Sequence, residues 1–191
     1  ALAKRGDNRL NRLQLDPEIK CYLPGIPRAT YLPHPFQIVQ SHTQMLMVYQ
    51  YSYARREILF DKPGESPGDF WMGWSTGKWD GDTLVVDVSG FVIPTDLRPT
   101  DPNSPAAAAP HWLDRAGNFY SENTHVVERF TPIGANHLMY EATIEDPKVY
   151  TRPWKITMPL YRRLDNTQIL EFKCTELTEE LRWGRFRKRG V

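Results

Sequence analysis

The side chains best suited to acid–base chemistry lie on the segment Thr124–Thr131, THVVERFT. Its alternation of polar and apolar residues predicts a β-strand on which His125 and Arg129 share one face. Glu122 stands just before this strand. A histidine near a carboxylate and an arginine can transfer a proton or bind an anion. His125 and Arg129 are therefore candidate catalytic residues. A half-exposed strand histidine with one hydrogen-bonded neighbour explains the same pattern without chemistry.

The sequence lacks the usual signatures of cofactor and metal chemistry. It contains no Gly-rich nucleotide loop, G-x-S-x-G elbow, H-E-x-x-H pair or EF-hand loop. Asp80, Asp82 and Asp87 do not have calcium-loop spacing and fit a hairpin turn better. The histidines other than His125 fall in expected turns or loops, so a metal site would need several of them to converge. We expect neither a cofactor nor a metal.

Aromatic residues are abundant, with 6 Trp, 9 Tyr and 8 Phe. Alternate residues of a closed barrel point into its lumen, and a lumen rich in Tyr and Trp suits a flat or apolar ligand. The alternation places three tyrosines, at positions 49, 51 and 53, on one strand face. An aromatic core that binds nothing is the alternative. The candidate ligand-binding residues are Tyr49, Tyr51, Trp71, Trp74 and Trp154.

Both ends of the chain are basic. Four cations lie within the first twelve residues, and the tail RWGRFRKRG at 182–190 interleaves cations with Trp183 and Phe186. Cations mixed with aromatic rings suit an acidic protein face or anionic lipid head groups. A solvated tail is the alternative. The candidate partner-binding residues are Arg182, Trp183, Arg185, Phe186 and Arg187.

Length and composition restrict the class of protein. A chain of 191 residues is sufficient for one domain. Its formal net charge of +1 argues against a nucleic-acid binder, and no apolar run is long enough to span a membrane. We expect an N-terminal arm or short helix at 1–20, a β-barrel-like domain at 21–175, and a short helix with a basic tail at 176–191.

Strand patterns dominate the middle of the chain. Asp80-Gly81 between two strand-like arms predicts a hairpin with a type I′ turn, which has positive φ at both central residues. No helices alternate with the strands, so about eight or nine antiparallel strands should curl or close. The expected fold class is all-β, an up-and-down, lipocalin-like barrel with extended terminal arms. A β-sandwich is the alternative. Strands are expected near 36–40, 44–53, 56–60, 124–131, 137–146, 154–163 and 167–174, together with two hairpin arms within 70–91, the second of them at 82–88.

Cys21 and Cys174 are the cysteines of the chain. They lie where the first and last strand-like segments meet polar loops, which favours a single disulfide and an oxidising compartment. Two unpaired, buried thiols are the alternative. Their positions do not give the C-x-x-C spacing of a zinc site.

Several phrases together resemble a widespread bacterial family of exported proteins that has no assigned activity. The resemblance covers about Asp16 to Cys174, and Trp71–Phe91 is its most distinctive block. It implies export to the periplasm or the cell exterior and supports the Cys21–Cys174 pairing. Tyr120 stands where members often have His. The phrases are CYLPGIPR, PFQIVQS, WMGWSTGKWDGDTLVVDVSGF, SENTHVVERF, YEATIEDPKVYTRPW and LEFKC.

Two functions follow as hypotheses. The first is a ligand-binding domain or accessory subunit of a periplasmic or membrane-associated assembly, with a protein partner or an anionic membrane surface at its basic termini. The second is a cofactor-free lyase, hydratase or isomerase that acts on a small hydrophobic or aromatic molecule inside the barrel. In the second, His125 is the acid–base group and Arg129 binds an anion or oxyanion.

Overall fold

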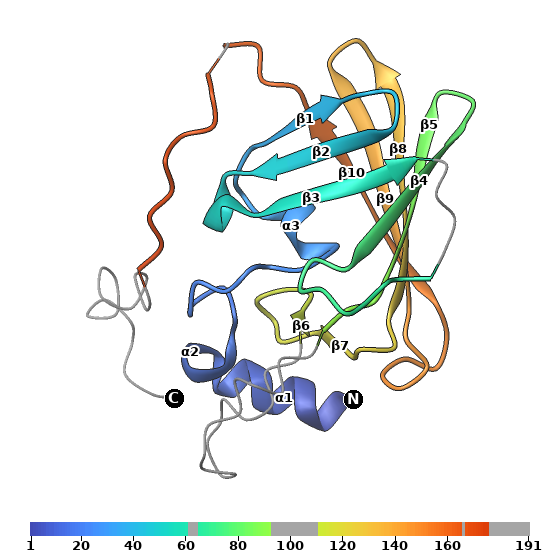
Figure 1. Ribbon diagram of the computed structural model, residues 1–191. Helices are drawn as coiled ribbons and strands as arrows, with labels where there is room; N and C mark the ends of the chain where they lie inside the picture. The colour runs from blue at the N-terminus through green and yellow to red at the C-terminus, as the bar shows by residue number, and fades with distance from the viewer. Residues whose placement is uncertain (61–64, 93–110, 166, 176–191) are drawn as a thin grey trace.

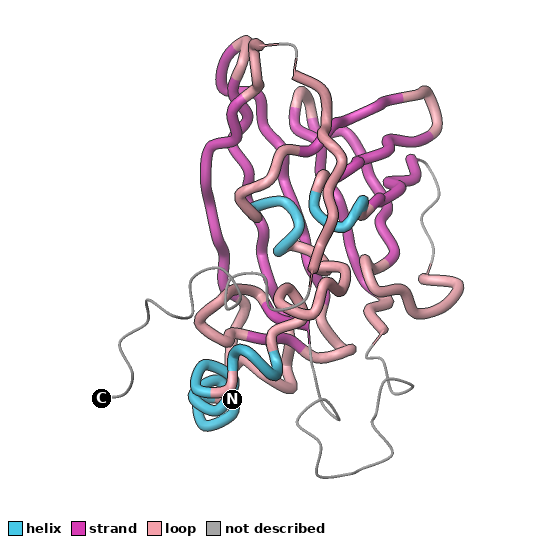
Figure 2. Tube along the Cα trace, turned by 90° about the vertical axis from the view of Figure 1, so that its left-hand side faces the viewer, coloured by secondary structure: helices cyan, strands magenta, loops and turns pink. Residues whose placement is uncertain are grey.

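The computed structural model describes residues 1–60, 65–92, 111–165 and 167–175, and these form mainly β-structure (Figure 1). The short helices are α1 (Leu2–Leu10), α2 (Arg12–Leu15) and α3 (Arg28–Tyr31), with a 3-10 turn η1 (Tyr51–Tyr53). Within the described ranges, none of the helices has the length and apolar character needed to cross a bilayer. Figure 2 shows α1 and α2 at one end of the molecule, with α3 and η1 between the strands.

Eight strands form one curled sheet in the order β1-β2-β3-β4-β5-β8-β9-β10. The strands β6 (His111–Trp112) and β7 (Phe119–Tyr120) form a separate small pair. The strands of the large sheet are β1 (Phe36–Gln40), β2 (Gln44–Tyr49), β3 (Arg55–Phe60), β4 (Trp74–Asp80), β5 (Thr83–Ser89), β8 (His125–Gly134), β9 (His137–Glu145) and β10 (Trp154–Tyr161).

The sheet is a half-barrel, and the expected closed, wholly antiparallel barrel is wrong in two respects. First, β3 and β4 pair in parallel, because the connection between them returns to the starting end of β3 before β4 begins. Second, β1 and β10 remain edges of the sheet. The alternative, a two-sheet sandwich, does not describe a single eight-stranded sheet either.

The missing closure is explained by the segment after β10. Thr167–Cys174, expected to be the last strand, forms no strand. It runs as an extended segment down one side of the molecule (Figure 1), where Phe172 contacts His34 just before β1. A disulfide joins Cys174 to Cys21, with their Cα atoms 5.6 Å apart. The expected disulfide is thus confirmed, and the chain is consistent with an oxidising compartment.

Pro159 lies in the middle of β10 because β10 is an edge strand. The Arg162 N–H donates to the Asn136 carbonyl at 2.9 Å, so the even-numbered residues of β10 point their backbone groups toward β9. Pro159, an odd-numbered residue, therefore has its nitrogen on the free edge, where the missing N–H removes no ladder bond.

Two local expectations also need correction. Asp80 pairs with Thr83, so the turn residues are Gly81 and Asp82, and only Gly81 has positive φ (58°). This is the type II′ pattern, in which glycine takes the first central position. In addition, β2 ends at Tyr49, and the chain turns through η1, where Ser52 has a φ of 52°. The expected tyrosine stripe is therefore interrupted.

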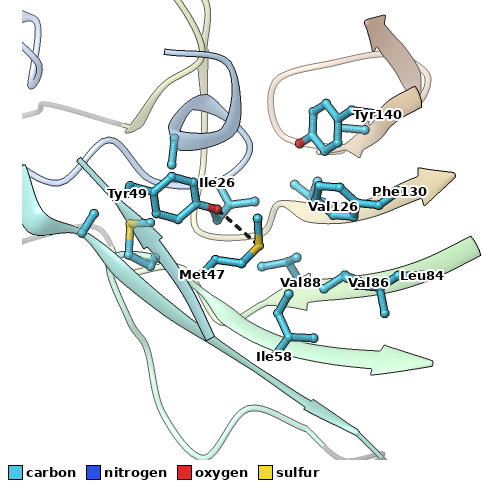
Figure 3. Close-up of a cluster of buried hydrophobic side chains, with 14 of the residues drawn as sticks. Ile26, Met47, Tyr49, Ile58, Leu84, Val86, Val88, Val126, Phe130 and Tyr140 are labelled. Atoms are coloured by element: carbon cyan, nitrogen blue, oxygen red, sulfur yellow. Dashed lines mark hydrogen bonds between the residues drawn. The ribbon is translucent and has the colours of Figure 1, made fainter. Parts of the chain in front are cut away.

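The core fills the concave side of the half-barrel. Alternate residues of each strand are buried there, among them Met47, Ile58, Val86 and Ile144 at 0% exposure. Figure 3 shows buried side chains from β2, β3, β5, β8 and β9, among them Met47, Ile58, Val86 and Tyr140, with Tyr49 beside Met47. Ile26, just before α3, and Ala29, within α3, belong to the same cluster. This segment therefore covers part of the open side.

Candidate functional site: the mouth of the half-barrel

The strand register brings three hairpin turns and the ends of β3 and β10 to one end of the half-barrel, which we call the mouth. Phe60 at the end of β3 donates its N–H to Thr43 in the β1–β2 turn. The Thr83 and Thr131 hydroxyls lie 3.0 Å apart, so the β4–β5 and β8–β9 hairpins are neighbours. Tyr161 pairs with His137, which brings the end of β10 to the same place. Figure 1 shows the helices α1 and α2 at the opposite end.

A hollow of about 520 Å³ opens at the mouth. Trp79 and Phe60 form its aromatic wall, with ring centroids 6.3 Å apart. Trp79 pairs with the buried Leu84, so it lies on the concave face, yet it remains 50% exposed. An exposed indole beside a buried phenyl ring can stack on a flat apolar group. The hollow is lined by Gln40, Ser41, His42, Phe60, Gly77, Lys78 and Trp79.

Gly77 is among the residues that line this hollow. A Cβ at this position would lie 2.7 Å from the Ile58 Cγ2 atom and 3.0 Å from the Phe60 ring. The Ile58 and Phe60 side chains of the neighbouring β3 fill the space that a side chain at position 77 would need, so β4 requires glycine here. Neither Gly77 nor Trp79 was among the site residues expected from the sequence. The sequence feature that indicates them is a glycine two residues before a tryptophan on a strand.

The candidate catalytic residues lie outside this hollow. His125 and Arg129 share one face of β8, as the strand alternation predicts, but this is the convex face and not the barrel interior that the enzyme hypothesis needs. Each of the two pairs with an aspartate. The His125 Nε2 atom lies 2.8 Å from the Asp87 carboxylate, and Arg129 donates to Asp80 at 2.9 Å. All four side chains are 40% exposed or more. Their position matches a solvated face, and a catalytic role for His125 and Arg129 stays a prediction.

The five candidate ligand-binding residues do not converge on one space. Tyr49 and Tyr51 are core residues at 1% and 3% exposure. Trp71, half-buried, donates its indole N–H to the Leu23 carbonyl. Trp74 stacks on Phe70 at the end opposite the mouth. Trp154 contacts Tyr150 with ring centroids 5.4 Å apart.

A buried ion pair between β3 and β8 crosses the core and was not among the residues expected to be functional. The Arg56 guanidinium on β3 donates to the Glu128 carboxylate on β8, and both side chains are 1% exposed or less. Tyr140 donates to the other Glu128 oxygen at 2.6 Å, and Arg56 donates to the Ser75 hydroxyl at 2.7 Å. Burial opposes the charge of Arg56, but Glu128 beside it raises the pKa of the guanidinium. The alternation Val126-x-Glu128-x-Phe130 was the signal, because it places a glutamate on an apolar face.

A second buried charge cluster anchors the N-terminal segment. Arg28 donates to Asp16 at 2.9 Å and to Glu18 at 2.5 Å, with its side chain 1% exposed. Arg115 donates to Glu18 at 2.6 Å. Burial works against the charged carboxylate, but Arg115 and Arg28 together lower the pKa of Glu18. These bonds fix the position of the segment before α3.

His111 and Tyr120 form a buried stacked pair across β6 and β7. Their ring centroids are 5.0 Å apart and their planes differ by 8°. The His111 Nε2–H donates to the Val92 carbonyl at 2.6 Å. Burial lowers the pKa of His111 to about 4 and raises that of Tyr120 well above its usual value. Gly25, with φ of 70°, packs so closely that a Cβ there would lie 2.6 Å from the Tyr120 hydroxyl.

The candidate partner-binding residues, Arg182, Trp183, Arg185, Phe186 and Arg187, lie outside the described residues. Among the residues that are described, no group of three or more His, Cys, Asp or Glu side chains is placed to hold a metal ion.

Comparisons of this chain with protein-family models, curated proteins and solved structures find no match. Its function must therefore be argued from its own residues.

Proposed function

We propose that the chain is an exported binding domain whose mouth takes a small molecule with a flat apolar part. The observation that carries the proposal is the half-exposed Trp79 facing a hollow of about 520 Å³ on the concave side of the sheet. This volume lies in the range of small-molecule sites, roughly 300–1,000 Å³. The export and the periplasmic or extracellular location rest on the family resemblance and agree with the disulfide.

The chemistry of the lining favours a ligand with one apolar and one polar end. Phe60 and Trp79 supply the apolar surface, while Gln40, Ser41 and His42 supply polar groups from the β1–β2 turn. Lys78 is exposed at the same opening and can attract an anionic group. The accessory role in an envelope assembly rests on the basic C-terminal tail and stays a separate prediction.

Binding can be tested with 8-anilinonaphthalene-1-sulfonate, which carries a fused aromatic ring and a sulfonate. We expect a saturable rise in its fluorescence with the folded wild-type protein. The Trp79→Ala variant should bind the probe about tenfold more weakly, a change of ~1.4 kcal/mol. Lys78→Gln should weaken binding mainly at low salt, because exposed charges are screened beyond about 8 Å at physiological ionic strength.

Phe70→Ala is the matched control. Phe70 is an aromatic residue of similar exposure, 41%, at the end of β4 opposite the mouth. Its removal should leave probe affinity unchanged. Equal affinity of wild type and Trp79→Ala, with unchanged melting temperatures, would show that the probe binds elsewhere and that the mouth is not the site.

A further inference from the structure

Exposed apolar side chains gather around the mouth as well as inside it. Val39, Trp79, Ile133, Tyr161 and Leu164 are 51%, 50%, 53%, 69% and 70% exposed, respectively. The register places all of them at this end, since Leu164 follows Arg162, which is bonded to Asn136 in the β8–β9 hairpin. We call these five residues the mouth rim.

The mouth rim is divided among separate protrusions. Val39 lies near the β1–β2 turn, Trp79 precedes the β4–β5 turn, and Ile133 precedes the β8–β9 turn. Tyr161 ends β10 and Leu164 follows it. Figure 1 shows these hairpins as distinct tips around the opening of the half-barrel. Because the hollow separates the β1–β2 turn from Trp79, and the other rim residues lie on a further hairpin and after β10, they do not form the continuous flat patch that a rigid protein partner would cover.

We propose that the mouth rim inserts into the interface of an anionic lipid bilayer. A fluid interface can accept each apolar tip separately, whereas a folded protein surface would need matching recesses. The residue types support this occupant, because Trp and Tyr prefer the head-group region and aliphatic side chains reach below it. This inference goes beyond ligand binding and does not depend on it.

The charges at the mouth agree with a membrane that carries some negative lipid. Lys78, Arg162 and Arg163 are exposed there, together with Arg129. Among the described residues, the carboxylates at this end are Asp80, Asp82, Glu141 and Asp165. Asp80 pairs with Arg129, Glu141 with Lys155 and Asp165 with Arg163. The described cations and carboxylates nearly balance, so apolar insertion should provide most of the binding and salt should remove only part of it.

Co-sedimentation with phosphatidylglycerol–phosphatidylcholine vesicles tests the proposal on the full chain. We expect wild type to pellet with the vesicles and the Ile133→Ser/Leu164→Ser variant to bind about tenfold more weakly. The matched control is Leu2→Ser/Leu10→Ser, because these leucines are 81% and 82% exposed on α1 at the opposite end. The control should bind as wild type does.

Other outcomes overturn the proposal. If wild type stays in the supernatant, the mouth rim does not bind this membrane, and a protein partner becomes its expected occupant. Equal losses in the rim variant and the α1 variant would show unspecific adsorption. An unchanged rim variant would place membrane binding elsewhere, such as the basic tail. Probe binding in lipid-free solution should be the same for the rim variant and wild type, so failure here remains distinct from failure of the proposed ligand site.

Discussion

At the scale of single residues, the least replaceable side chains are the buried charges. Arg56 and Glu128 neutralise each other where neither contacts water. Removing one charge leaves the other uncompensated, which typically costs about 3–5 kcal/mol. We therefore expect Glu128→Gln to lower the free energy of unfolding by about that amount, measured by urea denaturation.

Glu141→Gln is the control for this prediction. Glu141 pairs with Lys155 at 2.5 Å on the surface, and the lysine is 53% exposed. Exposed pairs contribute about 0–1 kcal/mol, so this variant should stay close to wild type. If Glu128→Gln lowers the free energy of unfolding as little as Glu141→Gln does, the Arg56–Glu128 pair is not essential for the core.

The buried His111 should make the protein less stable in acid. Burial lowers its folded-state pKa to about 4, whereas an unfolded histidine has a pKa near 6.5. The unfolded chain therefore binds the proton more readily, and stability falls as pH decreases from about 6.5 toward 4. The two values imply a loss of about 3 kcal/mol at pH 4.

This contribution can be isolated with His111→Gln, which keeps an N–H for the Val92 carbonyl and does not titrate. The variant should lose about 3 kcal/mol less than wild type between pH 8 and pH 4, measured by denaturant unfolding at each pH. Parallel curves for the two proteins would mean that His111 is already accessible to protons in the folded state. Glu18, whose pKa is also lowered, contributes to both proteins alike.

At the scale of elements, the period-two patterns predicted most strands of the sheet because alternation follows directly from strand geometry. The strand at Thr124–Thr131, with His125 and Arg129 on one face, is an example. The alternation along a strand does not show which other strand pairs with it, so the parallel pairing of β3 with β4 could not be predicted. Nor does it show where a tyrosine series leaves the strand, as at Tyr51. The hollow beside Trp79 combines residues of the β1–β2 turn, β3 and β4, which become neighbours only through this strand pairing.

The β4–β5 turn depends on the backbone of Gly81. Its φ is 58°, and no atom lies within 4 Å of a Cβ placed there, so a substitution meets backbone strain without a steric clash. Gly81→Val should cost about 1–3 kcal/mol, seen as a lower melting temperature. Gly6→Ala, on α1 with equally open surroundings, should instead be neutral or slightly stabilising because alanine favours helix. An unchanged Gly81→Val protein would mean that the turn tolerates another conformation.

At the scale of the whole molecule, the open half-barrel is a consequence of where the C-terminal segment is held. A run such as TQILEFKC has the composition of a closing strand, so the sequence favoured closure. Cys174 is instead bonded to Cys21, near the N-terminal helices, and Phe172 contacts His34 and Tyr51. The segment therefore passes the start of β1 without forming a strand beside it, and Ile26 and α3 cover part of the open side instead.

The Cys21–Cys174 disulfide should therefore act as a clamp on the segment Thr167–Thr175. The Leu170 and Phe172 N–H groups donate to the Gln50 and Tyr53 side chains, and the Phe172 ring lies 5.0 Å from that of Tyr51. These exposed contacts are weak, so we expect Cys174→Ser to release the segment while the sheet remains folded. Hydrogen exchange should then accelerate in this segment and stay slow in β8 and β9.

Because the bond closes a loop of 153 residues, the free energy of unfolding should also fall, by at most about 5 kcal/mol in the chain-entropy model. Phe172→Ala with the disulfide intact is the control, and it should loosen the segment only slightly. Loss of protection throughout the sheet in Cys174→Ser would instead make the bond a requirement for the fold itself.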